Sequence, residues 1–66
     1  MRLTDFWSRL ETVFGPEYAA SVADDQVLSA LGGRTVNQAL RAGVPTVTVW
    51  RAVCVAYPDR VPARLR

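Results

Sequence analysis

The sequence predicts an all-α fold, a single small domain of about four helices spanning residues 1–66. Its length of 66 residues fits one domain, and its hydrophobic content of 50% is enough for one core. Apolar residues recur at helical spacing between glycine and proline breaks, which favours helices over strands. In the C-terminal half, the last two predicted helices form a helical hairpin that resembles a helix-turn-helix.

The first predicted helix begins near the N-terminus and ends at Gly15. One apolar stripe runs along it, formed by Phe6, Trp7, Leu10, Val13 and Phe14. Gly15 suits the left-handed residue that follows a helix, and Pro16 suits the first turn of the next one.

The second predicted helix covers residues 16–31 and ends at Gly32-Gly33. Val22, Leu28 and Leu31 give it apolar positions, and neither glycine nor proline interrupts it. Asp24-Asp25 leaves a break open, because aspartate can cap a new helix. We favour one continuous helix.

The third predicted helix begins after a capping box and is short. Thr35 can bond the backbone N–H of Gln38, whose side chain can reach back to the backbone of Thr35. Gly43 then closes the helix as a left-handed residue, and the chain enters a fourth segment at Pro45 or Thr46.

The fourth segment alternates like a strand over residues 46–50, but it has helical spacing over a longer window. We therefore expect a helix that ends at Pro58, followed by an irregular tail over residues 58–66. One arc of the helix is apolar and holds Val49, Trp50, Val53, Cys54 and Tyr57. Such a helix is either central in the fold or keeps a face for a partner.

Several kinds of site are excluded by composition. Cys54 is the only cysteine and the chain has no histidine, so a zinc site or a histidine-based mechanism cannot be built from it. We expect no enzyme activity, no cofactor and no metal. The chain also lacks an apolar run of about 20 residues and a secretory leader, so we expect a cytoplasmic location and no membrane insertion.

Charge is divided between the two halves of the chain. Residues 1–33 hold two arginines against five carboxylates, a net charge of −3, whereas residues 34–66 hold six arginines against Asp59, a net charge of +5. The basic half is compatible with an acidic partner, either nucleic acid or a protein surface. The alternative is that the two halves attract each other or are simply solvated.

Candidate contact residues fall in this basic half. They are polar, basic or exposed apolar positions on the last two helices and just before them: Arg34, Asn37, Arg41, Thr48, Arg51 and Val55. Arginine with asparagine and threonine suits phosphate and base-edge contacts. Ala39, Gly43 and Val49 also have the offsets of a helix-turn-helix, although Gln38 stands where an apolar residue is usual.

The chain resembles a small actinobacterial family of uncharacterised proteins encoded beside the genes of the recombinase RecA and its regulator RecX. The segments that carry the resemblance are MRLTDFW, DQVLSALGGRTVNQAL, VWRAVC and the ending VPARLR. Val47-Thr48 departs from the charged residues expected early in the last helix. The resemblance implies no activity or site residues, but it suggests a link to DNA repair or recombination.

Together these observations predict a non-catalytic module that binds a protein partner. The alternative is a helix-turn-helix protein that binds DNA through its basic half. Association with a second copy of the chain is a further option that the apolar fourth helix leaves open.

Overall fold

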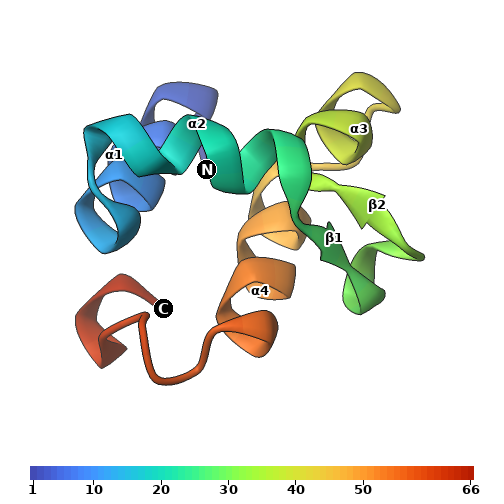
Figure 1. The fold of residues 1–66 in the computed structure, drawn as a ribbon. Coiled ribbons are helices and arrows are strands. Elements are labelled where there is room, and N and C mark those ends of the chain that lie inside the picture. The colour runs from blue at the N-terminus through green and yellow to red at the C-terminus, as the bar shows by residue number, and fades with distance from the viewer.

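The structure is a computed structural model that describes all 66 residues. Its four α-helices are α1 (Leu3–Phe14), α2 (Pro16–Asp25), α3 (Val36–Arg41) and α4 (Thr46–Ala56). Between α2 and α3 lie the strand β1 (Val27–Leu28), the 3-10 helix η1 (Ser29–Leu31) and the strand β2 (Arg34–Thr35), and a second 3-10 helix, η2 (Ala63–Leu65), follows α4. In Figure 1, α2 crosses above α4, with α1 on one side and α3 and the strands on the other.

The fold is mostly helical, but it is not all-α, and the predicted single helix over residues 16–31 is wrong. Helix α2 ends at Asp25, and Gln26 is already extended, with φ −88° and ψ 120°. β1 and β2 then pair as a two-stranded antiparallel sheet in which Val27 faces Thr35 and Leu28 faces Arg34. We call this segment, residues 27–35, the hairpin.

The hairpin replaces helix for local reasons. Asp24 and Asp25 stand at the negative end of the dipole of α2, where carboxylates are unfavourable, and aspartate is a weak helix former. Gly32 and Gly33 both have positive φ, 71° and 80°, a conformation that only glycine adopts without strain. The N–H of Gly33 donates to the carbonyl of Leu28 at 3.1 Å and closes the turn.

The predicted start and end of α3 are confirmed. The hydroxyl of Thr35 accepts from the N–H of Gln38 at 3.1 Å, and the side-chain carbonyl of Gln38 accepts from the N–H of Thr35 at 2.9 Å. At the other end Gly43 has φ 85°, and the N–H of Val44 donates back to the carbonyl of Ala39 at 3.0 Å. The capping box and the left-handed glycine thus fix both ends of a six-residue helix.

Replacing Thr35 with alanine should lower the free energy of unfolding by about 1–2 kcal/mol, because the cap of α3 is lost and Thr35 is only 7% exposed. Urea denaturation followed by circular dichroism measures the change. Thr48→Ala is the matched control, because Thr48 is exposed on α4 and its loss should cost less than about 0.5 kcal/mol. Equal losses in the two variants would contradict the capping role.

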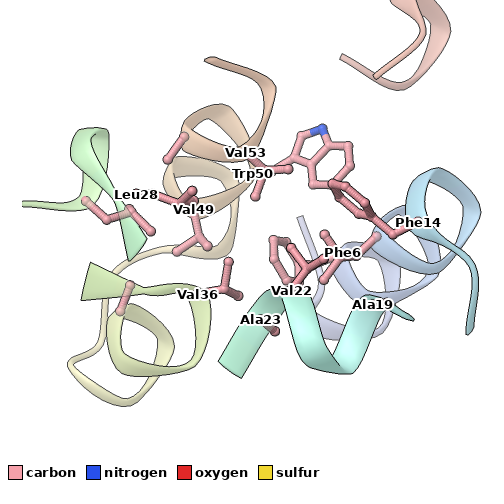
Figure 2. Close-up of a cluster of buried hydrophobic side chains, with 14 of the residues drawn as sticks. Phe6, Phe14, Ala19, Val22, Ala23, Leu28, Val36, Val49, Trp50 and Val53 are labelled. Carbon is pink, nitrogen blue, oxygen red and sulfur yellow. The ribbon is translucent and has the colours of Figure 1, made fainter. Parts of the chain in front are cut away.

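Helix α4 is confirmed as a helix, and it is the centre of the core. The predicted inner arc faces inward: Val49, Trp50 and Val53 are buried, and Cys54 and Tyr57 are half-buried. Figure 2 shows side chains from α1, α2, the hairpin and α4 converging on one cluster. The fifteen residues of this cluster are Phe6, Leu10, Phe14, Ala19, Val22, Ala23, Leu28, Leu31, Val36, Ala39, Val49, Trp50, Ala52, Val53 and Val61.

The tail after α4 returns to the body of the fold. It forms a turn and then η2, and Val61 is only 2% exposed. The indole N–H of Trp50 donates to the carbonyl of Leu65 at 2.7 Å, and Nη1 of Arg9 donates to the same oxygen at 3.4 Å. Figure 1 shows the C-terminus folded back toward α1. The tail therefore closes the core on the side of Trp50.

Candidate docking surfaces

Three surface grooves lie on different parts of the molecule. One is between the hairpin and α4, and we call it the apolar groove; its residues are Val27, Leu28, Ser29, Ala30, Ala52, Val55 and Ala56. The second is among α1, α2 and α3, and we call it the tryptophan groove; its residues are Leu3, Trp7, Asp24, Asn37, Leu40 and Arg41. The third, which we call the aromatic groove, is formed by Phe14, Tyr18, Ser21, Val22, Asp25, Gln26, Tyr57 and Arg60.

The apolar groove presents aliphatic side chains to solvent. Val55 is 71% exposed and Val27 is 61% exposed, the largest exposures among the valines at the surface. Ala30 comes from η1 and Ala52 from α4, and their small side chains leave a hollow of about 290 Å³ between the two valines. Val55 lies outside the inner arc of α4, as the sequence predicts, whereas the exposure of Val27 follows from the hairpin.

Strand geometry explains why sequence reasoning missed Val27. On a helix over residues 16–31, Val27 would be one of several apolar residues with no clear exposed position. On β1, by contrast, neighbouring side chains point to opposite faces. Val27 is therefore exposed and Leu28 is buried. The signal that could have found it is the Gly32-Gly33 pair, which is typical of a tight turn as well as of a helix end.

Three predicted contact residues form one exposed stripe on α4. Thr48, Arg51 and Val55 are spaced i, i+3 and i+7, and all three are exposed. Val55 belongs to the apolar groove, so Thr48 and Arg51 extend its surface along the helix. Arg34 is exposed on β2 and pairs with Leu28, so its side chain leaves the hairpin on the face opposite to Val27.

The other two predicted residues lie on a different surface. Asn37 and Arg41 line the tryptophan groove, where the amide of Asn37 donates to the carboxylate of Asp24. Nε of Arg41 donates to the carbonyl of Asn37 at 3.4 Å, one turn back along α3. The structure therefore spreads the six predicted contact residues over several surfaces and does not gather them into one.

Of the two tryptophans, one is a core residue and the other is partly exposed. Trp50 is 1% exposed and its ring meets that of Phe6 edge-on, with centroids 5.9 Å apart. Trp7 is half-buried, contacts Phe6 edge-on at 5.6 Å and forms part of the tryptophan groove. Trp50 therefore belongs to the core, whereas Trp7 contributes to a surface groove.

The aromatic groove was not predicted. It brings Phe14 and Tyr18, at the α1–α2 junction, next to Tyr57 and Arg60, which follow α4. The rings of Phe14 and Tyr57 meet edge-on with centroids 5.1 Å apart. These residues are far apart in the sequence, and only the return of the tail brings them together.

Cys54 is a free, half-buried cysteine. Burial raises the pKa of the Cys54 thiol, although Arg66 and Arg9 oppose this, so the thiol form predominates at neutral pH. No group of three or more histidine, cysteine, aspartate and glutamate side chains lies close enough together to hold a metal ion.

None of the helices is both long enough and apolar enough to cross a membrane.

In comparisons with known proteins, no curated protein and no solved structure matches the chain. A family model does match it, over residues 1–64, and the family is described as Protein of unknown function (DUF3046). Because this match covers nearly the whole sequence, the chain belongs to the DUF3046 family.

Proposed function

We propose that this protein is a non-catalytic interaction module of the cytoplasm that binds a protein partner through the apolar groove. The observation that carries the proposal is the pair Val27 and Val55, which are mostly exposed on either side of a hollow lined by alanines. Exposed aliphatic side chains are common singly, but a contiguous group at a groove is typical of a contact surface.

The charge beside the apolar groove indicates the chemistry of the partner. Arg51 is exposed one helical turn before Val55. An apolar ridge flanked by carboxylates would fill the groove and meet this arginine. The family resemblance favours a partner in DNA repair or recombination.

Replacing Val55 with aspartate should reduce capture of the partner from lysate about tenfold, because a charge enters the centre of the contact. Arg51→Glu should also weaken capture, through repulsion of the partner's carboxylates. Quantitative mass spectrometry of the captured proteins measures both effects. Both positions are exposed, so the two variants should fold normally by circular dichroism.

The controls for these variants are Ala20→Asp on α2 and Arg64→Glu in the tail, which make the same changes of charge away from the groove. Both should capture the partner as well as the parent does. Folded Val55→Asp and Arg51→Glu proteins with unchanged capture would show that the apolar groove is not the docking surface.

Duplex DNA is the second candidate partner, because all six arginines of residues 34–66 are exposed and α3 and α4 form a helical pair turned at Gly43. On this alternative, anisotropy of a labelled duplex should rise at 20 mM salt and fall steeply by 150 mM, as phosphate contacts require. Arg51→Ala should flatten that salt dependence. Absence of binding at 20 mM salt would remove the alternative.

A further inference from the structure

We propose that the aromatic groove binds an arginine side chain presented by a peptide segment of a protein partner. This second contact uses none of the residues of the apolar groove, so it can hold or fail independently of the function proposed above. Three features of the groove support the proposal: exposed aromatic rings, a cation already held on one of them, and the carboxylate of Asp25.

The first feature of the groove is its aromatic rings. Half of the six aromatic side chains in the sequence line this one groove, which has a volume of about 390 Å³. Phe14 is buried at its base and Tyr57 is half-buried beside it, whereas Tyr18 is 61% exposed on α2. Tyr18 thus presents aromatic surface that no part of this fold covers, and a planar cation binds well to such a surface.

The groove already holds a cation of its own chain. The guanidinium carbon of Arg60 lies 4.9 Å from the centroid of the Phe14 ring, within the range of a cation–π contact. Phe14 and Tyr57 are themselves packed edge-on, so the base of the groove is rigid. The contact shows that a guanidinium fits against the rings at this site, and it leaves the ring of Tyr18 for a second one.

Helix α2 contributes one carboxylate to the groove. Asp25 lies in the aromatic groove at the negative end of the helix dipole. A cation placed there would gain from the carboxylate and from the dipole together.

Arginine satisfies these features better than lysine. Its guanidinium is planar, stacks on an aromatic face and presents paired donors to a carboxylate, whereas the lysine ammonium is a compact, strongly hydrated charge. We place the guanidinium of the partner over the ring of Tyr18, with its donors directed at Asp25. Gln26, beside Asp25 in the groove, offers a further amide to the peptide backbone.

The test is an NMR titration of the ¹⁵N-labelled chain with the blocked tripeptide acetyl-Ala-Arg-Ala-amide. The matched probe replaces arginine with citrulline, which keeps the shape and removes the charge. Saturable shifts are expected at amides near Tyr18, Asp25 and Tyr57, and citrulline should bind at least about fivefold more weakly. No saturable shift with the arginine peptide, or equal shifts with both peptides, would overturn the proposal.

Variants then assign the contact. Tyr18→Ala and Asp25→Asn should each weaken binding about threefold to fivefold, and Arg60→Ala should strengthen it about twofold because a like charge is removed. Asp24→Asn is the matched control, because the neighbouring carboxylate of Asp24 lines the tryptophan groove, and binding should stay within about twofold of the parent. If Asp24→Asn and Asp25→Asn weakened peptide binding equally, the binding would depend only on the net charge of the protein, and the assigned site would be overturned.

Discussion

Replacing Trp50 with alanine should leave the chain unfolded at 25 °C. Trp50 is 1% exposed, its ring packs edge-on against Phe6, and its indole N–H donates to the carbonyl of Leu65 at 2.7 Å. Truncating a buried aromatic residue to alanine costs about 3–5 kcal/mol. A domain of this size has a free energy of unfolding of about the same magnitude, so the single change is enough.

Far-ultraviolet circular dichroism with thermal melting measures this loss. Trp50→Phe keeps most of the buried ring and removes the hydrogen bond, so it should cost only about 1–2 kcal/mol and retain a cooperative transition. Trp7→Ala should also retain one, because Trp7 is only half-buried. A Trp50→Ala protein that melts within a few degrees of the parent would contradict the placement of α4 at the centre of the core.

Ending the chain after Pro58 should lower the free energy of unfolding by about 3 kcal/mol. The truncation exposes the core surface covered by Val61, a side chain whose burial contributes about 1.5–3 kcal/mol. It also leaves the indole N–H of Trp50 without its acceptor on Leu65, which costs about 1 kcal/mol or more. Urea denaturation of both chains gives the difference directly.

The control for this truncation is a chain that ends at Leu65. Its terminal carboxylate still accepts from Trp50 and from Arg9, and Val61 remains in place, so the loss should stay below about 1 kcal/mol. If removing residues 59–66 costs no more than removing Arg66 alone, the tail does not close the core as described.

Elements whose signals are local could be predicted from the sequence. The capping box at Thr35 and Gln38 and the left-handed Gly43 are each defined within a few residues, and both are confirmed. In α4, the helical spacing of apolar residues predicted the structure better than the β-branched residues at its start. The reason is that the buried residues recur on one face of the helix over about three turns. The same arc separated buried Trp50 from exposed Val55.

The hairpin was not predicted because its strands have only two residues each. Val27 and Leu28 are too few to show alternation, and both also fit a helical pattern with Val22 and Leu31. What decides the outcome is pairing with Arg34-Thr35 across a glycine turn, a contact that spacing along one segment does not reveal.

The candidate surfaces were predictable only in part for the same reason. Val55 follows from the geometry of one helix, but its groove needs Ala30 of η1 to lie beside Ala52 of α4. The aromatic groove needs Tyr57 to return to Tyr18, which depends on the fold of the whole chain. Sequence spacing thus identified single exposed residues and not the surfaces that combine them.

Photo-crosslinking from position 55 tests the central claim, that the apolar groove holds a protein partner, most directly. A benzophenone side chain placed there by Val55→benzoylphenylalanine should crosslink to one discrete protein in living cells, and Arg51→Glu in the same chain should abolish that product. The same probe at position 20, exposed on α2, should not form it. Absence of a product from position 55, or an identical product from position 20, would contradict the claim.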